Sequence, residues 1–361
     1  MGADKAEEET KEVDKLGDHY IQAKFLGQWS FTEEKDRDGT VYAQKLDDPS
    51  GRWFKVSIEN ILTETGGDKL TPVEVEQINI AATKQRANPT FQKDLSKYDH
   101  QMEIQRLIDL PSMPIDENSL EADLLHPIEN NGYTALSEAV DDPSRIKHRL
   151  NFPYLAKWIL LHQRRTPKGK RLLRESIRQA TARVAGRQIS QTEFKDFLQQ
   201  NNCGNNYLLY LDYLNGGYNQ AKSARLQRLY SRIWTVREIS RPIDVICGDN
   251  PIVDVGTYPQ SVLVPLGPRR VLFIHIPAPG IGTTPLIDSQ VRSFNGIQRQ
   301  NAERWLISNV ENPVVPTPGQ IADEERRLAF QTRTAGFIPR NAKCPCGSGR
   351  KFKNCCGRKS A

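Results

Sequence analysis

The spacing of apolar positions changes twice along the chain. Between residues 19 and 62, β-branched and aromatic residues alternate or cluster around Gly-containing turns, which is typical of short strands in an antiparallel sheet. From Thr71 the apolar positions recur at helical spacing, strand character returns over 243–276, and Asp288 begins a last long helix. This order predicts an α+β fold with a mostly helical middle and small antiparallel sheet segments from both ends. The expected N-terminal strands cover 19–29, 39–46 and 53–62.

Several helices begin with their own sequence signals. Thr71-Pro72-Val73-Glu74 is a capping box with proline at the first helical position, so a helix should follow it. Thr166-Pro167 predicts the start of a basic helix that runs to Gly186, and Ser190 opens another capping box. Further helices are expected at 90–110, 154–165 and 207–233, and a loop at 111–130.

The two ends of the chain differ in composition from its middle. Residues 1–17 are charged and contain no aromatic residue, which predicts a disordered leader. No apolar run marks a signal peptide or could cross a bilayer, so we expect a cytoplasmic protein without a membrane partner. The predicted organisation is the leader at 1–17, a single α+β main domain at 19–310 with a basic helical region at 145–235, a linker and short helix at 311–339, and a cysteine-rich tail at 340–361.

Positive charge is concentrated in two places, although the net charge is only +6. Between Arg145 and Arg187 there are thirteen Lys or Arg residues and one acid, Glu175. The tail from Arg340 onward adds seven basic residues and no acid. This distribution predicts a polyanionic partner, with nucleic acid, RNA or DNA, as the first candidate. The alternative is two solvated basic faces, balanced by the acidic first 144 residues.

Four of the six cysteines lie in the tail: Cys344, Cys346, Cys355 and Cys356. They are spaced C-x-C, eight residues, C-C, and Gly347-Ser348-Gly349 can form the turn that brings the pairs together. Four thiolates suit a tetrahedral Zn²⁺ ion and leave no position open for water, so the tail predicts a structural zinc knuckle, with disulfide bonding as the alternative. The segment resembles the SEC-C zinc motif, named for the C-terminus of the SecA preprotein translocase. That resemblance implies a knuckle that docks to another macromolecule.

A second resemblance covers most of the chain. It rests on six short motifs: His19-Tyr20 before Phe25-Leu26, Arg165-Thr166-Pro167, Trp234, Asp249-Asn250-Pro251, Pro265-Leu266-Gly267-Pro268 and Asn295. In the order of these motifs, residues 19–310 resemble the bacterial domain-of-unknown-function family 4238, which implies no settled activity. Two positions depart from the family pattern, because Gln22-Ala23 stands in place of Pro-Gln and Gly248 in place of the serine before Asp249.

Three residues in or next to predicted strands are candidate catalytic groups. His19 has a side chain suited to proton transfer near neutral pH, and Asp249 and Asn250 could orient it or bind a divalent metal or phosphate. The candidate phosphate-binding residues are Arg165, Asn295, Lys168, Lys170 and Arg171. A histidine base, a carboxylate and a phosphate clamp predict a nuclease whose basic helices and zinc knuckle hold the polyanion. Each residue also has a structural alternative, as a core histidine, a turn former or a helix-junction residue.

The competing hypothesis is a module without enzymatic activity. In that case the main domain recognises a nucleic acid or a protein, and the zinc tail docks to the ribosome or to another protein. The chain contains no P-loop, HExxH, G-x-S-x-G or dinucleotide-binding fingerprint, which excludes the enzyme classes that depend on them. Both hypotheses predict salt-sensitive binding to nucleic acid, so a cleavage assay separates them.

Overall fold

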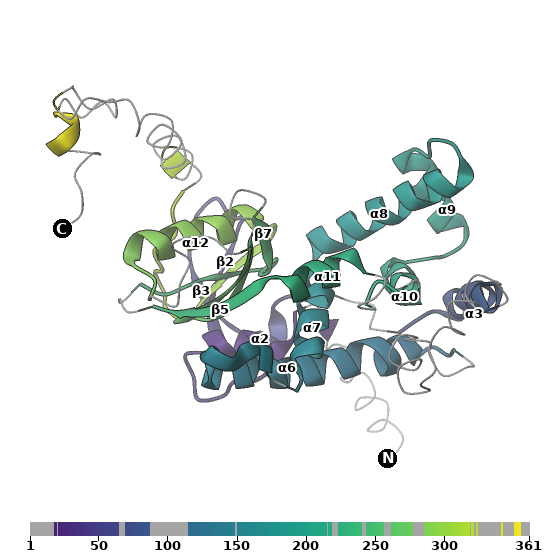
Figure 1. The fold of residues 1–361 in the computed structure, drawn as a ribbon, viewed down its shortest axis with the longest axis horizontal. Coiled ribbons are helices and arrows are strands. Elements are labelled where there is room, and N and C mark those ends of the chain that lie inside the picture. The colour runs from purple at the N-terminus through teal and green to yellow at the C-terminus, as the bar shows by residue number, and fades with distance from the viewer. Residues whose placement is uncertain are drawn as a thin grey trace, which may run out of the picture.

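Antiparallel sheets and a larger group of helices make up the described part of the chain (Figure 1). The computed structural model describes residues 18–19, 21–64, 69–86, 115–148, 150–214, 216–218, 223–239, 243–255, 261–276, 285–317, 319–320, 323, 341 and 350–354. Strands come from both ends of the main domain and helices fill its middle, so the predicted α+β class is confirmed.

One four-stranded sheet joins the two ends of the main domain. Its strand order is β3-β2-β10-β6, and all neighbours run antiparallel. Strand β10 lies between β2 and β6, with Ser308 opposite Tyr42 and Ile307 opposite Cys247. The last strand is therefore needed to complete a sheet that the first hairpin begins. The bounds are Thr40–Lys45 for β2, Phe54–Ser57 for β3, Cys247–Gly248 for β6 and Trp305–Ser308 for β10.

The second four-stranded sheet has the order β5-β9-β8-β7 and is also antiparallel. Every residue of β8 is buried, whereas β7 at the edge carries the exposed Asp254 after the buried Val253. A separate pair of two-residue strands, β1 and β4, places His19 opposite Thr63. The bounds are Ile233–Glu238 for β5, Val253–Val255 for β7, Ser261–Gly267 for β8, Arg270–His275 for β9, Asp18–His19 for β1 and Thr63–Glu64 for β4.

The helices begin largely where the capping residues predict. Thr71 and Glu74 exchange two hydrogen bonds ahead of α3, and the Thr166 hydroxyl accepts from the Gly169 N–H at the start of α8. Gly186 ends α8 with φ of 64°, a left-handed conformation in which glycine carries no steric penalty. Figure 1 shows α8 and α9 extending away from the sheets as an arm. The bounds are Ala23–Leu26 for α2, Pro72–Arg86 for α3, His126–Asp141 for α6, Phe152–Arg165 for α7, Pro167–Ala185 for α8, Gln191–Gln200 for α9, Asn205–Leu214 for α10, Ala224–Ser231 for α11 and Asp288–Asn301 for α12.

Several segments differ from the sequence expectation, and tertiary packing selects the conformation of two of them. The helix expected at 207–233 is instead two helices, α10 and α11, and Ile233 begins strand β5. Residues 23–29 form α2 and a 3-10 turn in place of the expected strand, and Phe25 packs its ring 5.3 Å from that of Trp158. The expected loop at 111–130 contains the start of α6. Helix α6 lies against α7 at Gly132, where an added Cβ would stand 2.4 Å from the Cβ of Trp158, so only glycine allows this approach.

The core is formed mainly by the helical part and by the inner faces of both sheets. None of the helices in the described ranges is both apolar and long enough to span a bilayer. The predicted leader at 1–17, the expected helix at 90–110 and the four cysteines of the tail lie outside the described residues.

Candidate functional site

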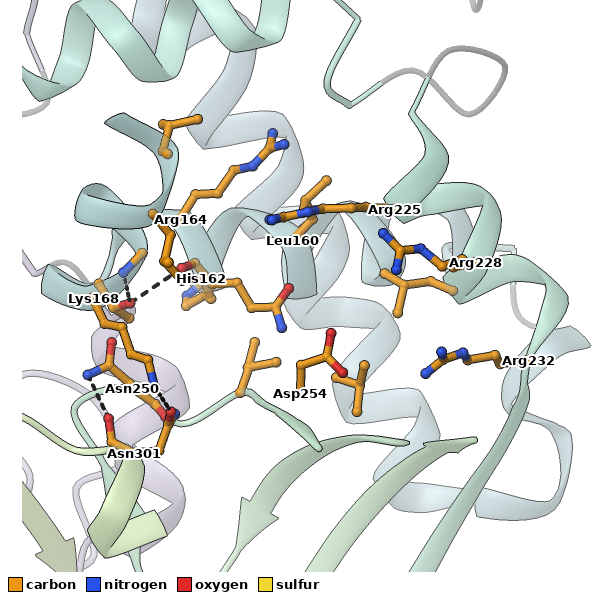
Figure 2. Close-up of a pocket in the computed structure, with 18 residues that line it drawn as sticks. Leu160, His162, Arg164, Lys168, Arg225, Arg228, Arg232, Asn250, Asp254 and Asn301 are labelled. Carbon is orange, nitrogen blue, oxygen red and sulfur yellow. Dashed lines mark hydrogen bonds between the residues drawn. The ribbon is translucent and has the colours of Figure 1, made fainter. Parts of the chain in front are cut away.

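A pocket of about 340 Å³ lies where α7, α8 and α11 meet the second sheet (Figure 2). Its helical wall includes Leu160 and Leu229, and its sheet wall includes Ile252 and Val262. These four side chains are buried and apolar, so they give the pocket a rigid apolar lining. Charged groups are added to this lining from two directions.

Three arginines reach the pocket from α11 and its C-terminal end: Arg225, Arg228 and Arg232. We call them the arginine row. Arg225 and Arg228, at i and i+3, lie on one face of α11, and Arg232 follows its last residue in extended backbone. Leu226 and Leu229 are buried on the adjoining face, whereas Arg225 and Arg228 are exposed, which fixes the side of the helix on which these two arginines lie. Figure 2 shows the arginine row on one side of the pocket.

Helix α11 is held at both ends by side-chain hydrogen bonds. The Ser223 hydroxyl accepts from the Leu226 N–H at 3.4 Å and caps the first turn. At the other end, Lys147 donates to the carbonyl oxygens of Tyr230 and Arg232, and the indole N–H of Trp234 donates to the Leu229 carbonyl at 2.8 Å. The backbone that carries the arginine row is therefore fixed on the body of the protein.

The opposite wall of the pocket contains the N-terminal turn of α8. Gly169 in this turn lies so close to α7 that an added Cβ would stand 1.7 Å from the Gln163 carbonyl oxygen. The ammonium of Lys168 donates to the side-chain oxygen of Asn301, which holds its positive charge at the pocket. The positive end of the α8 dipole adds to the same potential.

Asp254 is the one carboxylate among the described residues that line the pocket. Figure 2 shows it between the arginine row and the wall formed by Lys168 and Asn250. It forms no ion pair with any described residue. The neighbouring Arg164 is ion-paired to Asp212 and stacks over the ring of Tyr218 at 5.0 Å. Burial lowers the pKa of Arg164, and the positive charge of Arg225 lowers it further. The pocket therefore has an excess of positive charge that an anion would relieve.

His162 lies at the back of the pocket and is fully buried. Its ring stacks on Trp158 with centroids 4.0 Å apart, and its Nδ1 lies 3.1 Å from the Trp158 carbonyl oxygen. Burial, with a smaller effect from Arg165, lowers the pKa of His162 to about 3. The imidazole is therefore neutral near pH 7, and its Nε2 accepts from the Gln22 N–H at 3.5 Å. These contacts give it a structural role.

The predicted catalytic residue Asp249 is fully buried and engaged on both carboxylate oxygens. Oδ1 accepts from the Glu303 N–H and Oδ2 from the Arg304 N–H, each at 2.8 Å. Burial raises the pKa of Asp249, while these backbone donors act to lower it. The carboxylate thus fixes the turn between α12 and β10.

Asn250 joins this turn to the pocket. Its Nδ2 donates to the Asn301 carbonyl at 3.2 Å, and the Asn301 side chain donates back to the Asn250 carbonyl at 2.6 Å. The Asn250 Oδ1 atom is buried and accepts no hydrogen bond from the described residues. Asn250 lines the pocket with its other atoms, because this oxygen has almost no accessible surface.

Two amides on α12 hold the segment that precedes Asp249. The Asn295 Oδ1 accepts from the Ile246 N–H at 3.0 Å, and its Nδ2 donates to the carbonyl oxygens of Asp244 and Val314, both at 2.9 Å. Gln298 accepts from the Gly248 N–H and donates to the Pro251 carbonyl. The side-chain amides of Asn295 and Gln298 therefore hydrogen-bond to backbone N–H and C=O groups, as the backbone of a neighbouring strand would. We call Asp249, Asn250, Asn295, Gln298 and Asn301 the Asp249 cluster.

The other predicted site residues are distributed around this cluster. Arg171 forms a two-pronged ion pair with Glu303, next to Asp249, whereas Arg165 is buried and ion-paired to Glu129. Lys170 is half-buried on α8, and the backbone of His19 pairs with Thr63 in β1 while its side chain is outside the described set. The hydrogen bonds thus bring Lys168, Arg171, Asp249 and Asn250 into one network, and they direct Arg165 and Asn295 to other partners.

Much of the positive charge predicted for the helical region has internal partners. Arg187 pairs with Glu193, Arg178 pairs with Glu175, and Arg174 donates to Asn205 at 2.9 Å. No group of three or more His, Cys, Asp or Glu side chains within the described ranges could hold a metal ion. The expected divalent metal therefore finds no ready-made ligand set in this part of the main domain.

A family model described as a protein of unknown function (DUF4238) matches residues 18–312. The chain belongs to the DUF4238 family. In this DUF4238 protein a second model, the SEC-C motif, matches residues 340–358, so both resemblances are confirmed. No solved structure matches the chain. The DUF4238 description names no activity.

The arginine row was not among the residues selected from the sequence. It lies inside the predicted basic region at 145–235, but the basic residues selected from that region all come from the denser run of charge at 145–187. The available signal was periodic: Arg225 and Arg228 are three residues apart, as are the apolar Leu226 and Leu229, which is the spacing of an amphipathic helix.

Proposed function

We propose that this DUF4238 protein binds nucleic acid and holds one of its phosphate groups in the pocket beside α11. The observation that carries the proposal is the arginine row, since three guanidinium groups enter a pocket lined by a single carboxylate, Asp254. Guanidinium groups remain charged at physiological pH and match two phosphate oxygens at once. The N-terminal turn of α8 and Lys168 add positive potential from the opposite wall.

Nucleic acid is favoured over a simple carboxylic acid by the charge outside the pocket. The chain has a net charge of +6, and its tail adds a second basic region. A polyanion can contact both regions, whereas a small acid reaches only one. The tail then supplies further phosphate contacts, as expected for a protein with two basic segments.

The proposal is tested with 3′-fluorescein-labelled single-stranded RNA and DNA by fluorescence anisotropy over a series of salt concentrations. The double variant Arg225→Ala/Arg228→Ala should bind roughly 100-fold more weakly, because each charged hydrogen-bonded contact contributes about 1.5–3 kcal/mol. The matched control is Arg183→Ala/Arg187→Ala, two arginines at the far end of α8, which should lose about threefold. Equal losses in both double variants would place the binding surface elsewhere.

Phosphodiester cleavage is the second candidate function, and Asp254 is the observation that favours it. Its carboxylate forms no ion pair with the described residues and faces the arginine row, where a general base beside a clamped phosphate would lie. Catalysis by His19, Asp249 and Asn250 stays a prediction. An assay for RNA and DNA products separates the two sites, since loss of cleavage in Asp254→Asn but not in His19→Ala assigns the base to the pocket. A wild-type protein that binds without cleaving supports the binding module.

For the tail, we propose that Cys344, Cys346, Cys355 and Cys356 hold a structural Zn²⁺ ion and that the knuckle docks to a second macromolecule such as the ribosome or a protein partner. The support is the SEC-C match and the donor set itself, because four thiolates fit the tetrahedral preference of zinc. Metal analysis of purified Cys346→Ser protein is the test. It should contain no zinc while the main domain unfolds at nearly the wild-type temperature.

A further inference from the structure

The two sides of the pocket present different chemical groups to a ligand. The arginine row offers positively charged hydrogen-bond donors. Asp254 offers a hydrogen-bond acceptor instead. A ligand that satisfies both sides therefore has an anionic group at one end and hydroxyl or amino donors at the other.

A phosphate alone does not meet this requirement. Its oxygens would bind the arginine row but would be repelled by the carboxylate of Asp254 at the centre of the pocket. A ribonucleotide at the 5′ end of an RNA chain has a free 2′-hydroxyl, which can donate to a carboxylate, the contact by which acidic side chains commonly hold a ribose. A deoxyribonucleotide in the same position lacks the 2′-hydroxyl and cannot form this contact.

The pocket volume of about 340 Å³ limits how much of a nucleic acid can enter. It lies at the lower end of the range, roughly 300–1,000 Å³, of pockets that enclose one small molecule. A single nucleotide fits this range, and a duplex does not. Leu229, Ile252 and Val262 provide an apolar surface for the carbon atoms of the sugar and the base.

The excess of positive charge favours a chain end over an internal nucleotide. A terminal phosphate monoester carries close to two negative charges at neutral pH, because its second pKa is near 6, whereas an internal diester carries one. Among the described lining residues, Arg225, Arg228 and Lys168 provide three cations against the carboxylate of Asp254. A dianionic end group neutralises this excess more completely.

We propose that the pocket holds the 5′-phosphorylated terminal ribonucleotide of an RNA chain, with the phosphate on the arginine row and the ribose 2′-hydroxyl on Asp254. This inference rests on the proposed nucleic-acid binding and adds specificity for the end group and for the sugar. Asp254 is the residue that distinguishes ribose from deoxyribose.

The test uses three octamers of one sequence, all labelled at the 3′ end: 5′-phosphoryl RNA, 5′-hydroxyl RNA and 5′-phosphoryl DNA. The wild-type protein should bind the first roughly tenfold more tightly than either of the others, as expected for the loss of one charge-assisted contact. Arg228→Ala should remove the preference for the phosphate, and Asp254→Ala should remove the preference for RNA over DNA. Asp254→Ala should bind 5′-phosphoryl DNA at least as well as the wild type, because a repulsive charge is gone.

The outcomes separate this inference from the proposed function. Equal binding of all three octamers, unchanged by Asp254→Ala, would overturn the end and sugar specificity while nucleic-acid binding stands. If no octamer binds, calorimetry with adenosine 5′-monophosphate and its 2′-deoxy analogue decides the matter. If the wild type prefers the ribonucleotide and Asp254→Ala loses that preference, the pocket is specific for ribonucleotides, but the RNA-end assignment and the proposed nucleic-acid function are overturned. If the protein binds neither nucleotide, this inference and the proposed nucleic-acid function are both overturned.

Discussion

The Asp249 cluster and the arginine row lie on neighbouring parts of the same pocket region and use their polar groups in opposite ways. In the Asp249 cluster, both carboxylate oxygens and most amide groups bond to the backbone of the chain. In the arginine row, the guanidinium groups enter a cavity whose lining has one carboxylate. The polar groups of the Asp249 cluster are thus used within the protein, whereas the arginine row presents charge to a ligand.

This difference separates the residues that build the family's fold from those that face a ligand. Asp249, Asn250 and Asn295 belong to the sequence motifs, and their contacts hold the 244–251 segment against α12. A buried polar network of this kind fixes one arrangement of the chain because each group left unpaired is costly. The pocket instead obtains its charge from α11, outside the motifs.

The largest effect on stability is expected from Asp249→Ala. The substitution removes a buried carboxylate and leaves the N–H groups of Glu303 and Arg304 without their acceptor, at a cost of about 1–3 kcal/mol each. Urea unfolding should therefore give a free energy of unfolding lower by about 3 kcal/mol. The matched control is Asp254→Ala, an exposed carboxylate on β7, which should stay within about 0.5 kcal/mol of the wild type. Equal losses would remove the distinction between the two sites.

A pH dependence follows from His162. Burial lowers the pKa of His162 from its ordinary value of 6.5 to about 3, so between these values the unfolded chain binds a proton that the folded chain does not. The contribution of His162 to the free energy of unfolding is therefore fully present above pH 6.5. It decreases as the pH falls below 6.5, by up to about 1.4 kcal/mol per pH unit. Unfolding curves at several pH values should show this slope, and His162→Gln should have a shallower one. An unchanged slope in the variant would mean that the imidazole is charged in the folded state.

Single substitutions in the arginine row should weaken binding without affecting the fold. Arg228 is exposed, so Arg228→Ala removes no buried contact, and RNA affinity should fall about tenfold at an unchanged free energy of unfolding. The dependence of affinity on salt should also become shallower by about one phosphate contact. A variant that loses stability together with binding would assign Arg228 to the fold.

The smallest effect is expected at Arg171, a residue chosen from its sequence context. Its ion pair with Glu303 is on the surface, with the arginine side chain 63% exposed, and such pairs contribute about 0–1 kcal/mol. Arg171→Ala should therefore change both stability and RNA affinity only slightly. A tenfold loss of affinity would extend the ligand site along α8.

The sequence predicted features with local signals and missed those that depend on contacts between distant segments. The caps at Thr71 and Thr166 are confirmed, because a capping residue and its partner lie within one turn. Helix α6 was missed, since Asn130, Asn131 and Gly132 have low helix propensity, and the close approach to Trp158 that explains Gly132 is a tertiary contact. Strand β10 was missed because its two partners, β2 and β6, come from distant parts of the chain.

The candidate site divides in the same way. Asp249 and Asn250 were correctly marked as turn residues, but spacing alone does not reveal that the Asp249 carboxylate faces the N–H groups of residues 303 and 304. The arginine row could have been found from its helical periodicity. That α7, α8 and the second sheet form a pocket in front of it depends on the tertiary structure.

The most direct test of the central claim compares RNA affinity in Arg225→Ala/Arg228→Ala and in Asp249→Asn, a replacement of nearly the same size, under conditions in which both variants are folded. Anisotropy with 3′-labelled RNA should give a loss of roughly 100-fold for the arginine variant and less than about threefold for Asp249→Asn. Circular dichroism on the same samples establishes that both are folded. A large loss for folded Asp249→Asn with wild-type binding by the arginine variant would contradict the account and place the ligand at the Asp249 cluster.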